Sequence, residues 1–224
     1  MCGKTIPHYA LTRSIARRKT RVNALMRATG ATGAIFKVIM STSGSDRFFV
    51  ITGGPGFGKT TLVEALADLG FPHQPEAGRA IIQDQVAIGG TALPWSDRRA
   101  FAELMLSWEM RSYRSGLALE GPVIFDRGVP DVVGYLRLSA LPAAPHVEAA
   151  ARQFRYHRHV FVAPPWPEIF KTDAERKQSF DEAARTCEVM IEVYRSLGYE
   201  PVPLPLVPVS ERARFVVDRV RQWR

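Results

Sequence analysis

The residues with the most direct chemical meaning lie in the segment Gly53 to Thr60, which reads GGPGFGKT. Two glycines separated by four residues and followed by Lys and Thr match the spacing G-x-x-x-x-G-K-[ST]. Backbone N–H groups can wrap a polyphosphate only where bulky Cβ atoms are absent, and glycines meet this requirement. The lysine ammonium can reach the β- and γ-phosphates, and the threonine hydroxyl is an oxygen ligand suited to Mg²⁺.

The segments on either side of this loop have the patterns that a phosphate site needs. Phe48–Thr52 is a β-branched and aromatic run typical of a buried strand. Thr61–Leu69 reads as a helix, and a helix N-terminus adds partial positive charge beside the phosphates. We expect a nucleoside triphosphate, ATP or alternatively GTP, to be bound by Gly53, Gly54, Pro55, Gly56, Phe57, Gly58, Lys59, Thr60 and Thr61.

A magnesium-dependent site also needs a carboxylate at the end of a neighbouring strand. The apolar run Val123–Phe125 ends in Asp126, after the break at Gly121-Pro122. We expect Thr60 and Asp126 to hold the Mg²⁺ ion, Asp126 through water. The alternative for Asp126 is an N-cap of the next helix.

The residue after this acid narrows the class of protein. Arg127 stands where motor ATPases usually carry the Glu that activates water, and the chain has no Asn-Lys-x-Asp guanine-reading motif. The letters Asp131-Val132-Val133-Gly134 match the GTPase pattern D-x-x-G but lie past the strand end. These features favour a kinase, in which the phosphoryl acceptor is a bound molecule and not water.

Further motifs add a family resemblance. The chain contains Glu76-Ala77-Gly78-Arg79, Asp126-Arg127-Gly128 with Asp131, and a polar segment over 173–183. Together with Gly53 to Thr61 they resemble a family of bacterial predicted ATPases. That family is grouped with the kinase-like domain of NadR-type NAD-biosynthesis proteins and, more distantly, with deoxynucleoside kinases. The similarity covers roughly residues 47–220, and the ordered set of motifs is more specific than the glycine loop alone.

The resemblance implies roles for the first of these motifs. In deoxynucleoside kinases a Glu at the end of the second strand is the general base on the acceptor hydroxyl, and Glu76 matches it. The alternative is an acid that caps the helix starting near Gly78. Arg79 could bind the acceptor, pair with Glu76, or be an exposed helix arginine.

Arg127 and Asp131 resemble the Arg and Asp of the kinase stretch (D/E)-R-S-x-x-D. Arg127 could bind the acceptor or a phosphate through its planar fork of donors. Asp131 could bind the acceptor or merely pair with Arg127. Gly128 departs from the pattern, because those kinases carry Ser there, and this puts nucleoside specificity in question.

A lid is expected after the strand at 159–163. Residues 171–179 are polar and dense in charge, and in this fold a lid brings a cation to the transferring phosphoryl group. Arg176 is the first choice for that cation, and Lys171 is the second. The alternative is a solvated helix face.

The order of elements predicts the fold class. We expect strands at 47–52, 72–76, 122–126, 159–163 and 200–207, and helices at 59–69, 79–88, 97–114, 131–139, 146–156, 180–197 and 210–223. Strands that alternate with helices indicate an α/β P-loop NTPase fold, a three-layer αβα sandwich with a parallel sheet. The resemblance adds a nucleoside- or nucleotide-kinase-like arrangement with a helical lid. Ligands should bind at the carboxyl ends of the strands.

Charge divides the chain into two parts. The 224 residues have a formal net charge of +8, and 46% of them are hydrophobic, which excludes wholesale disorder. Residues 1–39 contain eight Lys and Arg and no Asp or Glu, so the remainder is neutral. We expect a basic, disordered N-terminal extension at 1–46 and a kinase-like ATP-binding domain at 47–224. The extension could instead be an organelle transit peptide, or an arm that binds nucleic acid or anionic lipid.

Two hypotheses for function follow from these features. The first is a magnesium-dependent kinase that transfers the γ-phosphoryl group of ATP to a small-molecule acceptor, which the sequence does not identify. The second is a nucleotide-dependent switch that hydrolyses ATP or GTP slowly and acts through a partner. We expect no membrane span, and nucleic-acid binding only through residues 1–39. Two cysteines, Cys2 and Cys187, fit a reducing compartment, and we expect a cytoplasmic protein.

Overall fold

The computed structural model describes residues 45–170 and 178–223 of the chain. The chain divides into two units, Met1–Ser41 and Thr42–Arg224, and every described residue belongs to the second. Residues 1–44 of the expected basic extension and the lid residues Lys171 and Arg176 lie outside the described residues, so both expectations stay predictions. None of the described helices is long and apolar enough to cross a membrane.

A parallel sheet of five strands forms the centre of the second unit, as expected. Its spatial order is β2-β3-β1-β4-β5, and each neighbouring pair runs parallel. The strands are β1 (Phe48–Gly53), β2 (His73–Gln74), β3 (Val123–Asp126), β4 (His159–Ala163) and β5 (Glu200–Pro203). Because β1 is central, the loop that follows it emerges in the middle of the carboxyl edge of the sheet.

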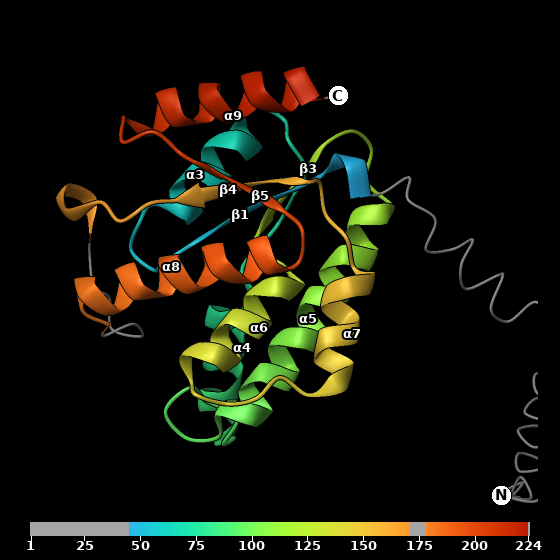
Figure 1. Ribbon diagram of the computed structural model, residues 1–224, viewed down its shortest axis with the longest axis vertical. Coiled ribbons are helices and arrows are strands. Elements are labelled where there is room, and N and C mark those ends of the chain that lie inside the picture. The colour runs from blue at the N-terminus through green and yellow to red at the C-terminus, as the bar shows by residue number, and fades with distance from the viewer. Residues whose placement is uncertain (1–44, 171–177, 224) are drawn as a thin grey trace, which may run out of the picture. The chain divides into compact units, whose positions relative to one another are not determined.

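Helices cover both faces of the sheet, so the architecture is the predicted αβα sandwich (Figure 1). The helices α3 and α9 pack on one face, and α5, α6, α7 and α8 lie on the other. The described helices are α3 (Lys59–Asp68), α4 (Ala77–Ile88), α5 (Arg98–Leu117), α6 (Val129–Leu138), α7 (Pro145–Gln153), α8 (Phe180–Ser196) and α9 (Val209–Trp223), with short 3-10 turns η1 (Ser45–Arg47) and η2 (Pro167–Ile169).

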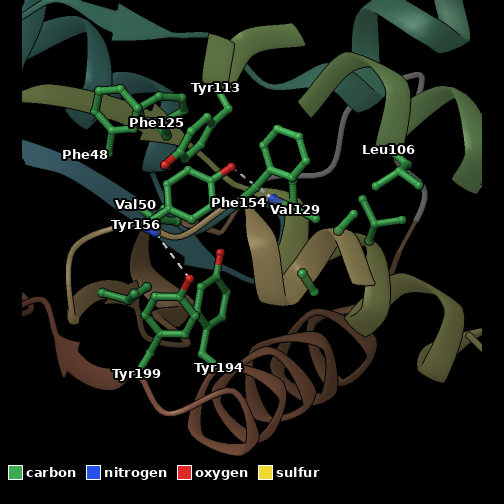
Figure 2. Packing of buried hydrophobic residues seen from close by; sticks show 14 of the residues in the cluster. Phe48, Val50, Leu106, Tyr113, Phe125, Val129, Phe154, Tyr156, Tyr194 and Tyr199 are labelled. Atoms are coloured by element: carbon green, nitrogen blue, oxygen red, sulfur yellow. Dashed lines mark hydrogen bonds between the residues drawn. The ribbon is translucent and has the colours of Figure 1, made fainter. Parts of the chain in front are cut away.

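The central strands are buried on both faces, which explains their nearly continuous apolar sequence. Alternate residues of β1 enter different cores: Phe48 and Val50 face α5 and α6, whereas Phe49 and Ile51 face α3 and α9. Figure 2 shows the first core, in which Tyr156 lies between Phe125 and Tyr199. Aromatic rings are therefore a large part of the core between the sheet and the α5–α6 layer.

Several elements end or begin where the pattern did not predict, and α6, α7 and β5 show the physical reasons. Helix α6 starts at Val129, two residues early, because Pro130 is well suited to a first helical turn. Helix α7 ends at Gln153 and leaves Phe154 and Tyr156 to pack in the core. Strand β5 stops at Pro203; its prolines are tolerated because it is an edge strand that pairs only with β4.

Phe125 offers a direct test of this core. Its fully buried ring lies 5.0 Å from the ring of Phe48 and 5.3 Å from that of Tyr156, centroid to centroid. Replacing it with Ala removes buried area and leaves a cavity, so Phe125→Ala should lower the free energy of unfolding by about 3–5 kcal/mol. Urea denaturation measures the change. A loss within about 0.5 kcal/mol, the range of a surface substitution, would contradict the packing.

Candidate active site

The glycine loop connects β1 to α3 at the centre of the carboxyl edge. Gly58 is the N-cap of α3 and has φ 73°, a left-handed conformation that suits glycine. At Gly54 a Cβ atom would lie 2.1 Å from the carbonyl oxygen of Ala183 on α8. The close packing of the loop against α8 therefore requires glycine at position 54. The motif allows any residue there, so the structure explains why this chain has glycine.

Lys59 begins α3 and points back into the loop. Its side chain is buried, and Nζ donates a hydrogen bond of 2.6 Å to the carbonyl oxygen of Gly54. The ammonium group therefore lies against the backbone of the glycine loop, and its contact with phosphates stays a prediction.

Asp126 and Thr60 meet beside the loop because β3 is the neighbour of β1. The register pairs Asp126 with Ile51, and the Thr60 hydroxyl donates to Oδ2 of Asp126 at 3.4 Å. Both side chains present oxygen atoms, the ligand type that Mg²⁺ prefers. The two residues expected to hold the metal are thus brought together, although binding itself stays a prediction.

The Arg127 side chain links the end of β1, where the glycine loop begins, to Glu76, which follows β2. Its Nε donates to Oε1 of Glu76 at 3.1 Å, and its Nη1 donates to Oδ1 of Asp131 and to the carbonyl oxygen of Gly53, each at 3.2 Å. Burial acts to lower the pKa of Arg127, but the carboxylates of Glu76 and Asp131 outweigh it and raise the pKa. The backbone has φ 78°, which is costly for a residue with a side chain and is typical of functional sites.

Asp131 is buried and supports Arg127 from the first turn of α6. Its carboxylate accepts hydrogen bonds from the Thr52 hydroxyl at 2.5 Å, from the Tyr194 hydroxyl at 2.6 Å and from the Gly128 N–H at 3.0 Å, besides that from Arg127. Bonds within the protein thus occupy both of its oxygens. Gly128 has a structural reason as well, because a Cβ there would lie 2.8 Å from the ring of Tyr156.

Two cavities open at this edge of the sheet. The smaller, about 520 Å³, lies along the glycine loop and is lined by Gly58, Lys59, Thr60, Arg79, Trp166 and Arg212 among others. The larger, about 990 Å³, extends between α4, α5, α6 and α8 and contains Glu76, Arg127 and Asp131. Pro55 and Gln178 line both cavities, so the two adjoin at the loop.

The predicted residues divide between these cavities. Glu76 and Arg127 lie in the larger one, on the side expected for an acceptor. Arg79 is exposed on α4 and lines the smaller cavity instead, beside the glycine loop. Arg176 falls outside the described residues.

Sequence reasoning missed Glu109. This carboxyl group is only 4% exposed, lines the larger cavity and makes no hydrogen bond or ion pair with a described residue. Burial raises its pKa well above the ordinary value, and the nearby charge of Asp131 adds to this effect. The available signal was the series Phe101, Met105 and Glu109, in which neighbours are four residues apart, so that all three share one helix face.

Arg212 was also missed. It is 3% exposed, donates through Nη2 to the carbonyl oxygen of Phe57 at 3.3 Å, and lies over the ring of Trp166. It forms no ion pair with a described residue, and burial lowers its pKa. Because it shares an i, i+4 face with Val216 and Val220, the apolar pattern of the helix concealed it.

Comparison with known proteins agrees with this geometry. A family model described as an AAA domain matches residues 48–212, and the chain belongs to this family. No curated protein matches the chain in sequence. The similarity to P-loop kinases that the motifs indicated therefore rests on the family model and on solved structures.

Solved structures share the fold at low sequence identity. A NadR protein in complex with NR is 18% identical, with a TM-score of 0.60 over 79% of this chain and 50% of that one. This chain thus spans about half the length of that NadR protein. The match with a deoxyadenosine kinase from M. mycoides (12% identical, TM-score 0.59) spans 78% of this chain and 99% of that kinase. The match with thymidylate kinase from Ehrlichia chaffeensis (13% identical, TM-score 0.53) spans 79% of this chain and 99% of that kinase. These structures confirm a P-loop kinase-like fold.

The raised pKa of Glu109 predicts a pH-dependent stability. The unfolded chain ionises this group near 4.5, whereas the folded protein holds the proton to higher pH, so stability falls as pH rises above about 4.5. Each pKa unit corresponds to about 1.4 kcal/mol. Glu109→Gln carries no titrating proton at this position. The melting temperature of the variant minus that of the wild type should therefore increase from pH 5 to pH 8.

The exposed Glu64 on α3 provides the control. Glu64→Gln removes an exposed carboxylate that pairs with no histidine among the described residues, and the gain with pH should be absent. If the melting temperatures of Glu109→Gln and the wild type change equally with pH across this range, the burial argument is disproved.

Proposed function

We propose that the protein is a magnesium- and ATP-dependent kinase that phosphorylates a hydroxyl group of a small molecule. The observation that carries this proposal is the meeting of two cavities at the glycine loop, with Glu76 and Arg127 on the acceptor side. A protein that only hydrolyses nucleotide needs no second cavity of about 990 Å³ beside the phosphates. The fold of the solved kinases supports the same arrangement.

The nucleotide would occupy the smaller cavity. Backbone amides of residues 53–61 and the Lys59 ammonium would bind the β- and γ-phosphates of ATP, with GTP as the alternative purine nucleotide. Arg212 supports this placement, because a buried guanidinium that pairs with no described carboxylate is stabilised by a bound anion. Trp166 beside it offers an aromatic face for the base.

Thr60 and Asp126 would hold Mg²⁺ at the end of the phosphate chain. The ion would supply positive charge to the transferring phosphoryl group. The oxygen donors of both side chains already lie 3.4 Å apart, so little rearrangement is needed for both to serve one ion directly or through water.

Glu76 would act as general base on the acceptor hydroxyl. Its carboxylate would accept the proton as the hydroxyl oxygen bonds to the γ-phosphorus, while the bond from that phosphorus to the β,γ-bridging oxygen breaks and ADP leaves. Arg127 would keep Glu76 ionised and oriented through its 3.1 Å ion pair. Asp131, whose oxygens are occupied within the protein, would position Arg127 and not touch the acceptor.

Two other residues keep roles that are only predicted. Arg79, at the phosphate loop, would contact phosphate and not the acceptor, given the cavity that it lines. Arg176 would bring a further cation to the transferring group, as the resemblance implies.

Glu76→Gln tests the chemical step. The amide cannot accept a proton, so transfer from ATP should fall by about 10²–10⁴, while ATP binding measured by calorimetry stays near that of the wild type. Product formation is measured with a panel of nucleosides and other hydroxyl compounds in the presence of Mg²⁺. Glu64→Gln, an exposed carboxylate on α3, is the matched control and should retain activity.

The result that would remove Glu76 as the base is unchanged turnover in Glu76→Gln. If the wild-type protein binds ATP but transfers to no acceptor, and captures a protein partner only when nucleotide is bound, the switch hypothesis replaces the kinase.

A further inference from the structure

The carboxylate of Asp131 has a complete set of hydrogen-bond donors inside the protein. Its Oδ1 accepts from the Thr52 hydroxyl at 2.5 Å and from Nη1 of Arg127 at 3.2 Å. Its Oδ2 accepts from the Tyr194 hydroxyl at 2.6 Å and from the Gly128 N–H at 3.0 Å. A carboxylate has about four lone-pair sites, so these bonds occupy all of them.

The neutral donors come from parts of the chain that are far apart in sequence. Thr52 lies on β1, Gly128 is the N-cap of α6, and Tyr194 belongs to the C-terminal half of α8. Tyr194 is fully buried among the aromatic rings of the core, beside Tyr199 (Figure 2). Phenylalanine would fill the same space. Packing therefore accounts for the ring of Tyr194, and the bond to Asp131 accounts for its hydroxyl.

The proton of this bond belongs to the tyrosine. Burial, together with the charge of Asp131, raises the pKa of Tyr194 well above its ordinary value, so the hydroxyl stays protonated and donates. A hydrogen bond to an ionised acceptor is stronger than one between neutral groups. Without it, a buried carboxylate oxygen would be left one donor short, which costs free energy unless the carboxylate finds a replacement.

The Arg127 guanidinium is the replacement that Asp131 already touches. Guanidinium and carboxylate groups favour two parallel hydrogen bonds, but Asp131 offers Arg127 only one oxygen, because other donors occupy the second. This arrangement leaves Nε of Arg127 for Glu76, at 3.1 Å, and lets Nη1 also reach the carbonyl oxygen of Gly53, at 3.2 Å. A carboxylate free to turn would take a second N–H of the guanidinium and draw it away from Glu76.

We propose that Tyr194 is a positioning residue: its hydroxyl fixes Asp131 so that Arg127 remains bound to Glu76, and α8 thereby helps to orient the general base. The Thr52 hydroxyl does the same for the other oxygen of Asp131. Neither Tyr194 nor Thr52 lines either cavity, so both act through Arg127. The consequence for phosphoryl transfer rests on the proposed kinase function, whereas the geometry of Arg127 can be tested without it.

Tyr194→Phe tests that geometry by NMR of nitrogen-15-labelled full-length protein. The Nε–H signal of Arg127, identified by its absence in Arg127→Lys, should exchange slowly with water while it donates to the shielded carboxylate of Glu76. Loss of this bond exposes the proton, so the exchange rate in Tyr194→Phe should rise by about 10-fold or more. Tyr113→Phe is the matched control: it removes a 2.8 Å bond from another buried core tyrosine to the carbonyl oxygen of Arg155, and the rate should not change.

A second pair of variants decides the matter if Tyr194→Phe does not fold. Thr52→Val removes the hydroxyl that donates to Oδ1 of Asp131, and the Arg127 exchange rate should rise by a similar factor. Thr52→Ser keeps the hydroxyl and loses only a methyl group. Its rate should stay near that of the wild type, whereas an effect of packing alone would make the serine variant the more disturbed of the two.

Phosphoryl transfer measures the consequence for the chemistry. The assay contains Mg²⁺, ATP and the compound, among the nucleosides and other hydroxyl compounds named above, that the wild type phosphorylates fastest. Tyr194→Phe should lower kcat by about 10-fold or more, because a displaced base costs rate, while KM for ATP stays unchanged. Tyr113→Phe should retain the kcat of the wild type.

The inference is overturned by an unchanged Arg127 exchange rate in Tyr194→Phe, or by an equal rise in Tyr113→Phe, which would assign the effect to the core in general. A faster exchange with unchanged kcat also overturns it, because Tyr194 would then hold Arg127 without serving the base. If the wild type phosphorylates no compound, the proposed function fails instead, and the exchange rates still decide whether Tyr194 positions Arg127.

Discussion

The ion pairs of one guanidinium hold this site together. Arg127 binds Glu76, which precedes α4, Asp131 on α6, and the backbone of Gly53 at the end of β1. The side chains of Arg127 and Glu76 are 14% and 13% exposed, so the pair is shielded from water and strengthened by the low local dielectric. Removing Arg127 would take an ion pair from two shielded carboxylates, Glu76 and Asp131, which is more costly than losing a surface pair. The same contacts couple the phosphate loop to the wall of the larger cavity.

The rest of the fold brings these groups to one place. In an open parallel sheet the carboxyl ends of the strands share an edge. The order β2-β3-β1-β4-β5 makes three of these ends neighbours: that of β2, which precedes Glu76, that of β3 at Asp126, and that of β1 at Gly53. The aromatic core beneath keeps that edge fixed: Tyr156 accepts a hydrogen bond from the N–H of Val129, the first residue of α6, and its own N–H donates to Tyr199 (Figure 2). Core packing and site geometry thus depend on the same residues.

Much of this could be predicted from sequence, because strand ends and glycine loops have local signatures. Gly53 and Asp126 each end a short apolar strand pattern, Lys59 has a fixed place in the glycine motif, and the structure places all three at one sheet edge. Glu109 and Arg212 could not be predicted in the same way. Each lies on an otherwise apolar helix face, and the sequence pattern predicts only that such a face packs in the core. The tertiary structure is needed to show that the face borders a cavity. The wall of the larger cavity combines residues from four helices, so no single segment encodes it.

The claim on which the account depends most is that the glycine loop grips the phosphates of a purine nucleotide. Isothermal titration calorimetry of folded protein with ATP and with GTP, each with Mg²⁺, measures this directly. The account predicts saturable binding of at least one of them by the wild type, and a loss of at least 10-fold in affinity in Lys59→Ala at an unchanged melting temperature. Absence of heat with both nucleotides, or equal affinity in Lys59→Ala and wild type, would contradict it.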